Sequence, residues 1–260
     1  MNIIVCVKQV PETTDVKIDP KTNTLIREGA ASIVNPFDAY AVEEAVRLRE
    51  KFGGKVTVLS MGPPQAEKAL REAISVGADE GVLLTDRAFA GSDTWATSYT
   101  LAKGIEKLGH FDMIICGKQA SDGDTAQVGP GIATHLNVPQ ATYVKKIEEI
   151  KGDKARIERM TEAGYEIIEI PLPCLLTVVK EINEPRLPSL KGKMKAKKAD
   201  IKIAASGDLN LDLSMTGLNG SPTKVVKIFT PPPKKGGRIL KGDAQDTACE
   251  LAELLRCDLL

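Results

Sequence analysis

Short apolar runs that alternate with amphipathic segments constrain the fold of this chain more than any other feature. Such runs occur at 3–7, 56–61, 82–84 and 113–116, and segments with helical periodicity lie between them. A strand that is apolar throughout is typical of a parallel sheet covered by helices on both faces. Residues 1–140 therefore predict an α/β fold with a doubly wound, mostly parallel, Rossmann-like sheet.

Capping residues mark where the helices begin. The segment Asn35–Asp38 combines an N-cap Asn, a Pro at the first helical position and an early acid, which predicts a helix start. Ser92 or Asp93 is the expected cap of a later helix. Residues 16–18 and 24–26 flank a turn that contains a Pro, and they predict a small hairpin at an edge.

A polar, Gly-rich turn at 117–129 joins one apolar run to the helical segment 130–136. Pro130 is tolerated near a helix start, which predicts a first helical turn at 126–130. The amides at a helix start lack partners inside the helix and bind anions such as phosphate. The chain contains no GxGxxG and no GxxxxGK. By itself the turn is equally compatible with a phosphate site and with an ordinary loop.

The ends of the apolar runs favour the binding interpretation. Parallel strands bring their carboxyl ends to one edge of the sheet, and ligands bind there where the strand order reverses. The runs end at Cys6–Val7, Ser60–Met61, Thr85–Asp86 and Gly117. We therefore expect these ends to form the walls of a single pocket.

Composition narrows the class of protein. The chain has 35 Lys and Arg residues and 35 Asp and Glu residues, and this zero net charge does not suggest nucleic-acid binding. Its five cysteines include no CxxC pair, which is typical of a reducing compartment. Neither His110 nor His135 has the Cys or acidic neighbours that predict a metal site. Without a signal peptide or a long apolar run, the sequence predicts a soluble, cytoplasmic protein with no membrane span.

The pattern changes after residue 140. Runs at 155–159, 165–170 and 174–179 predict antiparallel or mixed strands. Residues 191–241 carry twelve Lys and Arg against three Asp, and they predict an extended basic arm. An amphipathic helix is expected at 244–255.

Such an arm is either solvated or wrapped around another subunit. Because long irregular segments are uncommon in compact domains, we favour an arm that wraps a partner. The predicted organisation is a nucleotide-binding α/β domain at 1–190, followed by the arm and the terminal helix at 191–260.

Several motifs together resemble the beta subunit of electron transfer flavoproteins. The turn GKQASDGD resembles the nucleotide loop of that family. Ala163 departs from the family signature, in which an acidic residue or Gly is usual at this position. The resemblance spans residues 1–205, and the matching segments are 35–37, 117–124, 157–168, 173–177, 183–186 and 194–198.

The resemblance implies that this chain binds an adenine nucleotide and pairs with an alpha subunit. Cys6 and Met61 would pack against the adenine or the ribose, although plain core packing is the alternative for both. The amides of 123–128 would hold phosphate, with Thr125 and Gln127 as side-chain donors. The implied cofactor-binding residues are Cys6, Asn35, Pro36, Phe37, Asp38, Met61, Gly117, Lys118, Gln119, Ala120, Ser121, Asp122, Gly123, Asp124, Thr125, Ala126, Gln127 and Val128.

The identity of the nucleotide depends on the branch of the family. Ordinary members hold AMP, whereas members that split the electron pair of NADH hold a second FAD. Segments 60–64, 86–98 and 122–129 resemble the electron-bifurcating group, which makes FAD the expected cofactor and AMP the alternative. Thr94 and Thr97 would contact the flavin ring, and ordinary helix capping is the alternative for both.

The resemblance also implies partners. Leu190 stands where the family has a leucine that docks into an acyl-CoA dehydrogenase, and packing on the chain's own core is its alternative. Electrons from NADH would pass singly to ferredoxin or flavodoxin and, through FAD on the alpha subunit, to the acyl-CoA dehydrogenase. The chain would be an electron carrier without a catalytic nucleophile or base. A non-bifurcating carrier with structural AMP and a stand-alone adenine-nucleotide-binding regulatory protein are the competing interpretations.

Overall fold

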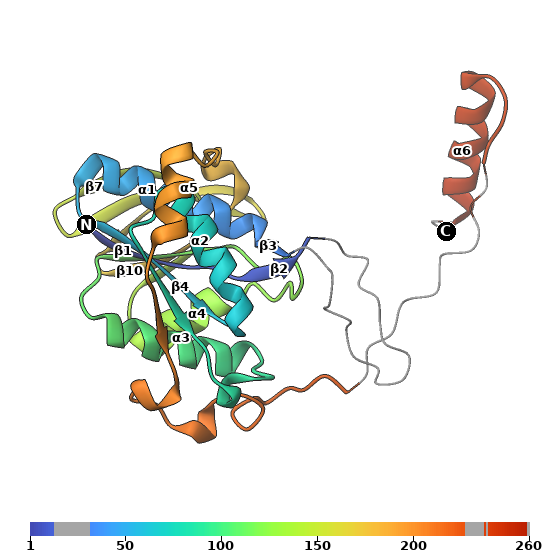
Figure 1. The fold of residues 1–260 in the computed structure, drawn as a ribbon. Helices are drawn as coiled ribbons and strands as arrows, with labels where there is room; N and C mark the ends of the chain where they lie inside the picture. The colour runs from blue at the N-terminus through green and yellow to red at the C-terminus, as the bar shows by residue number, and fades with distance from the viewer. Residues whose placement is uncertain (13–31, 227–236, 238, 259–260) are drawn as a thin grey trace. The chain divides into compact units, whose positions relative to one another are not determined.

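The computed structural model describes residues 1–12, 32–226, 237 and 239–258. The chain divides into two compact units, Met1–Val226 and Lys227–Leu260. The first unit holds the sheets and helices α1 to α5, and the second holds α6 (Ala244–Asp258), close to the helix predicted at 244–255 (Figure 1). The hairpin predicted at 16–18 and 24–26 lies outside the described residues.

A nine-stranded sheet with the order β11-β5-β4-β1-β6-β10-β7-β8-β9 forms the centre of the first unit. Five of its strands are β1 (Asn2–Cys6), β4 (Lys55–Met61), β5 (Glu80–Leu84), β6 (Met113–Gly117) and β11 (Ile201–Ala204). Each pairs in parallel with its neighbours. The predicted α/β fold with a mostly parallel sheet is confirmed.

The other half of the sheet is mixed, as the runs at 155–179 predict. β10 (Cys174–Val178) is parallel to both β6 and β7 (Gln140–Lys151), whereas β8 (Lys154–Thr161) and β9 (Gly164–Pro171) continue from β7 as an antiparallel meander. The sequence does not predict β7, because Lys and Glu interrupt its apolar residues without a clean alternation. A separate antiparallel pair is formed by β2 (Gln9–Pro11) and β3 (Ser32–Val34).

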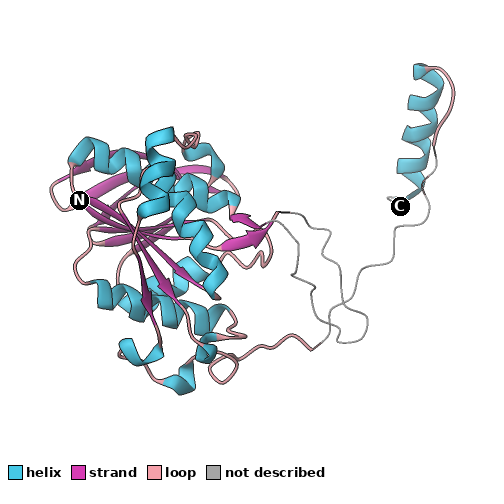
Figure 2. Cartoon of the chain, in the orientation of Figure 1, coloured by secondary structure: helices cyan, strands magenta, loops and turns pink. Residues whose placement is uncertain are grey.

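Helices cover both faces of the sheet (Figures 1 and 2). Since successive side chains of a strand point to opposite faces, β1 contributes Ile3 and Val5 to one core cluster and Ile4 and Cys6 to the other. The first cluster packs under α1 (Pro36–Phe52), α2 (Glu67–Val76) and α5 (Leu190–Lys198), and the second under α3 (Thr94–Leu108) and α4 (Val128–Leu136). Short 3-10 turns lie at η1 (Pro64–Ala66), η2 (Arg87–Phe89), η3 (Lys180–Ile182), η4 (Ser206–Asp208) and η5 (Leu213–Met215).

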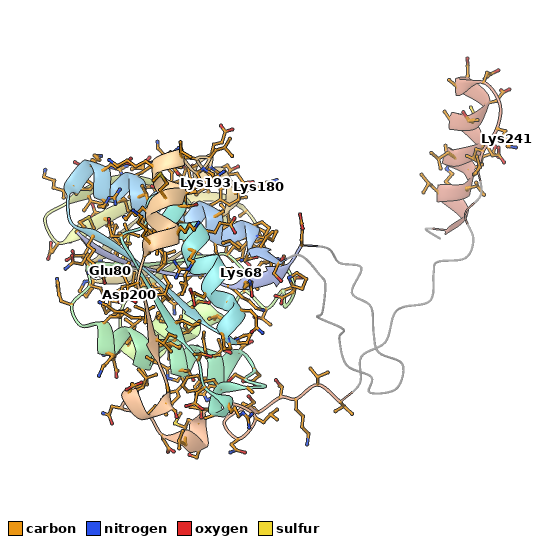
Figure 3. The ribbon with its side chains drawn as sticks, viewed as in Figure 1. Lys68, Glu80, Lys180, Lys193, Asp200 and Lys241 are labelled. Carbon is orange, nitrogen blue, oxygen red and sulfur yellow. The ribbon has the colours of Figure 1, made fainter. Side chains whose placement is uncertain are left out.

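Residues 191–226 belong to the first unit, which differs from the arm predicted to begin at residue 191. β11 extends the sheet beside β5, and α5 packs on α2, where Arg71 donates a hydrogen bond to the carbonyl oxygen of Ala199 at 3.0 Å. The basic composition is misleading because α5 buries Ala196 while it exposes lysines such as Lys193 (Figure 3). A partner-wrapping arm stays a prediction for the segment from residue 227 onward.

Candidate functional site

The strand order reverses at β1, which lies between β4 and β6. β1 ends at Cys6, in register with Cys116, and β6 continues to Gly117. Met61 is the last residue of β4 on the other side of β1. Ligands of open α/β sheets bind outside the carboxyl ends of the strands at such a reversal. The strand ends predicted to form one pocket thus share this edge.

The buried side chain of Asn35 connects the start of α1 to the Gly-rich loop. Its Nδ2 donates to the Asp38 carboxylate at 2.9 Å and to the carbonyl oxygen of Gln119 at 2.8 Å, and its Oδ1 accepts from the amide of Ser121 at 3.0 Å. Asn35 occupies the N-cap position as predicted, but its side chain makes no capping hydrogen bond to the helix. The loop takes those hydrogen bonds instead, so Asn35 fixes the loop against α1.

Asp38 is a buried carboxyl at the centre of this edge. Its Oδ2 accepts a hydrogen bond from the amide of Lys8 at 2.7 Å. Burial raises the pKa of Asp38 to about 7, although the hydrogen bonds from Asn35 and Lys8 oppose the rise. Gly117 is required here, because a Cβ at that position would overlap the Asp38 carboxylate and the backbone of Phe37. The helix and β6 therefore approach as closely as glycine allows.

The loop before α4 presents amides that the described part of the chain does not use. The amide of Asp124 donates to the carbonyl of Ala120 at 2.9 Å. Among the described residues, the amides of Gly123, Thr125 and Gln127 donate no hydrogen bond. Residues 121–125 are exposed, so these amides are open to a ligand.

Backbone conformation in the loop also points to a function. Asp124 and Ala126 have φ values of 54° and 55°, a left-handed conformation that costs a residue with a side chain about 1–2 kcal/mol. Alternating left-handed residues turn successive amides toward one side, as in the anion-binding concavities called nests. α4 begins at Val128, in agreement with the first turn predicted at 126–130. The loop thus fits a phosphate or diphosphate group.

Lys8 is a residue of this site that the sequence analysis missed. Its ammonium lies 2.6 Å from the Asp122 carboxylate, and it is the nearest atom to the side-chain position at Gly123, at 4.0 Å. The available signal was its place directly after the first apolar run. The Asp122 ion pair thus holds a cation beside the loop, where it would attract an anion.

Other predicted residues lie around the loop with different partners. The Lys118 ammonium lies over the rings of Phe37 and Tyr143, at 5.6 and 5.4 Å from their centroids. Gln119 hydrogen-bonds the Asp124 carboxylate. Lys118 thus contacts aromatic rings in this structure, and Gln119 supports the loop.

The start of α3 reaches the same loop. The hydroxyls of Thr94 and Thr125 lie 3.4 Å apart. Asp93 is the cap of α3, since its carboxylate accepts from the amides of Trp95 and Ala96; of the two caps considered, this one forms. Thr97 is half-buried one turn further along the helix. Thr94 is therefore brought to the loop directly.

Leu190 lies apart from this cluster, at the first position of α5, on the same face of the sheet as α1 and α2. It is 78% exposed and Leu187 is 89% exposed, so neither packs in the core of the first unit. Ser189 caps the helix by accepting from the amide of Gly192. The core-packing alternative for Leu190 does not hold in the described chain.

A family model, the electron transfer flavoprotein domain, matches residues 22–209. The chain belongs to the electron transfer flavoprotein family. It is 57% identical over 256 residues to the electron transfer flavoprotein subunit beta of Thermoanaerobacterium thermosaccharolyticum, and 50% identical over 256 residues to that of Clostridium acetobutylicum; both matches cover 98% of each chain. It is also 54% identical over 243 residues to the caffeyl-CoA reductase-Etf complex subunit CarD of Acetobacterium woodii, with 93% and 92% of the two chains covered.

These relatives confirm the resemblance to electron transfer flavoprotein beta subunits. The function of the chain is therefore electron transfer as a subunit of this family. None of the helices in the described part of the chain combines the length and the apolar composition needed to cross a membrane.

Proposed function

We propose that this electron transfer flavoprotein beta subunit holds the diphosphate of FAD on the loop 123–128 and takes part in electron bifurcation. The observation that carries the proposal is the set of exposed, unused amides beside two left-handed residues, Asp124 and Ala126. Backbone amides arranged in this way are the usual ligands of a nucleotide phosphate. Their place at the reversal of strand order agrees with that use.

In this proposal the side chains around the loop have different roles in binding the nucleotide. Cys6 and Met61 form an apolar wall for the adenosine, at the ends of adjacent strands. Asn35 holds the loop in place, and Lys8 supplies positive charge near the diphosphate. The hydroxyls of Thr94 and Thr97 would contact the flavin ring.

FAD is favoured over AMP because the site extends from the loop to the start of α3, where Thr94 meets Thr125. When bound, the flavin supplies the exchange between the two-electron chemistry of NADH and one-electron transfer. The chain's own residues bind and orient it. We further propose that ferredoxin or flavodoxin receives one electron and that FAD of the alpha subunit receives the other. The similarity to CarD, a subunit of a caffeyl-CoA reductase-Etf complex, supports an acyl-CoA dehydrogenase as final acceptor.

The partner surfaces follow from exposure. Leu187 and Leu190 form an apolar surface on an ordered loop and helix start, which suits a transient acyl-CoA dehydrogenase partner. In the second unit, α6 exposes Leu251, which suits packing on the alpha subunit in the cytoplasm. The segment 191–226 then belongs with the nucleotide-binding domain, and the arm begins at residue 227.

The test substitutes Gly123 by Val in the complex with the alpha subunit and measures the nucleotide content. A Cβ at Gly123 meets only the tip of Lys8 at 4.0 Å, so the fold tolerates the change while a diphosphate loses its place. We expect loss of the beta-chain nucleotide with the alpha-chain FAD retained. Gly207→Val is the matched control, because Gly207 is exposed with no atom within 4 Å. Full occupancy in Gly123→Val would contradict the proposal.

A second candidate function is a non-bifurcating carrier that holds AMP. The loop amides fit a single phosphate as well as a diphosphate, so this alternative shares the same site. A carrier of this kind would purify as a heterodimer with one flavin and one AMP.

A further inference from the structure

Two of the buried cysteines are neighbours at the carboxyl edge of the sheet. Cys6 of β1 and Cys116 of β6 are register partners in adjacent parallel strands, and both side chains belong to the same core cluster. Adjacent strands lie about 4.8 Å apart, which is within the Cα separation that a disulfide spans, about 4.4–6.8 Å. Both cysteines are free thiols.

The Cys116 thiol interacts with Cys6. A hydrogen bond with Cys6, together with burial, raises the pKa of Cys116. Cys116 is therefore the thiol that keeps its proton until the second step.

Accessibility separates this pair from the third buried cysteine. Cys6 is 8% exposed and Cys116 is 6% exposed, whereas Cys174 is fully buried. Cys174 pairs with Met113 at the opposite end of β6. Cys6 and Cys116 therefore keep a small solvent-exposed area, and Cys174 offers a control within the same sheet.

We propose that Cys6 and Cys116 form a dithiol site that a hydroperoxide converts to a disulfide. The Cys6 thiolate attacks one peroxide oxygen, the O–O bond breaks, and the leaving hydroxide or alkoxide takes up a proton; Cys6 becomes a sulfenic acid. Cys116 then attacks the Cys6 sulfur, the S–S bond forms, the S–O bond breaks, and the leaving hydroxide combines with the Cys116 proton as water. The two thiols lose two electrons, and the peroxide gains them.

The first arm of the test treats the full chain, in its complex and stripped of bound nucleotide, with hydrogen peroxide and maps its peptides after alkylation with N-ethylmaleimide. We expect a disulfide that links the Cys6 and Cys116 peptides and that dithiothreitol reverses. In Cys116→Ala, Cys6 should stop at the sulfenic acid and react with dimedone. Cys174→Ala should form the Cys6–Cys116 disulfide at the wild-type rate. Recovery of both cysteines as alkylated thiols, or linkage of Cys6 to another cysteine, would overturn the proposal.

A second arm rests on the proposed nucleotide site, which lies over the same strand ends. If the nucleotide covers Cys6, only the unliganded fraction of the protein is oxidised. FAD at a concentration of about a hundred times its Kd should therefore slow disulfide formation about a hundredfold. A disulfide that forms at an unchanged rate would leave the dithiol established and contradict the placement of the nucleotide. The two proposals therefore fail separately.

Discussion

The guanidinium of Arg186 donates from Nε to the Glu43 carboxylate at 2.8 Å, and it joins the loop after η3 to the middle of α1. Glu43 is nearly buried, with 4% of its side chain exposed. Burial would raise the pKa of Glu43, but hydrogen bonds from Arg186 and Arg47 outweigh it, and the pKa lies below its usual value. The same guanidinium pairs with Glu50 at 2.6 Å. This contact holds the loop that leads to Leu187 and Leu190.

Arg186→Ala should destabilise the first unit by about 2 kcal/mol, because it leaves the Glu43 charge buried without its main partner. The partly exposed position of Arg186 keeps the loss below that of a fully buried pair. Chemical denaturation measures this change in the free energy of unfolding. Glu50→Gln removes only the exposed partner and should cost less than about 1 kcal/mol. Equal losses in the two variants would show that burial of Glu43 is not the cause.

Ionisation of the buried Asp38 carboxyl should make the protein less stable as the pH rises. Its folded pKa of about 7 lies above the ordinary 3.8, so the folded state favours the protonated carboxyl. The stability from this group is complete below pH 3.8 and is lost as the pH rises through about 7. An Asn at this position does not ionise, so the free energy of unfolding of Asp38→Asn should not show this decline. Relative to the wild type, it should rise by up to about 4 kcal/mol over this pH range.

Urea denaturation across the same pH range checks this prediction, with Asp153→Asn at an exposed turn as the control. A constant difference between Asp38→Asn and the wild type would mean that Asp38 ionises normally in the folded protein.

The sequence predicts the parts of the fold that depend on local pattern. The apolar runs give β1, β4, β5 and β6 within a residue or two, because a strand covered on both faces is apolar throughout. Capping residues give α1 and α3 for the same local reason. α5 and β11 are not predicted, since their place depends on contacts with α2 and β5 that are distant in sequence.

In the candidate site, too, the sequence predicts the features that depend on local pattern and misses those that depend on contacts between distant segments. The Gly-rich turn is visible in the sequence, but its left-handed residues Asp124 and Ala126 are not, because neither residue type requires a positive φ. The role of Asn35 changes from helix cap to loop anchor for a similar reason, since its partners Gln119 and Ser121 are brought close only by the fold.

Two glycines of the loop should respond differently to substitution. Gly117→Ala places a Cβ against the Asp38 carboxylate and the backbone of Phe37, and it should cost about 1–3 kcal/mol of stability as well as nucleotide affinity. Gly123→Val should lower nucleotide affinity alone. Thermal unfolding of the nucleotide-free variants separates the two effects. A destabilised Gly123→Val would indicate that the loop is packed more tightly than the structure implies.

Lys8→Met should weaken nucleotide binding about tenfold or more, as expected for loss of one charge-assisted contact. The remaining affinity should depend less on ionic strength, because a screened charge has been removed. Titration calorimetry at low and high salt measures both effects. Lys68→Met, on the exposed surface of α2, is the matched control (Figure 3). An unchanged affinity in Lys8→Met would place the phosphate away from Asp122 and Gly123.

The nucleotide content of the purified complex tests the central claim most directly. The chain is co-expressed with its alpha subunit, the complex is denatured, and released FAD and AMP are quantified against protein. We predict two FAD molecules per heterodimer and no AMP. One FAD with one AMP would contradict the bifurcating assignment, and one FAD with no second nucleotide would contradict the nucleotide site itself.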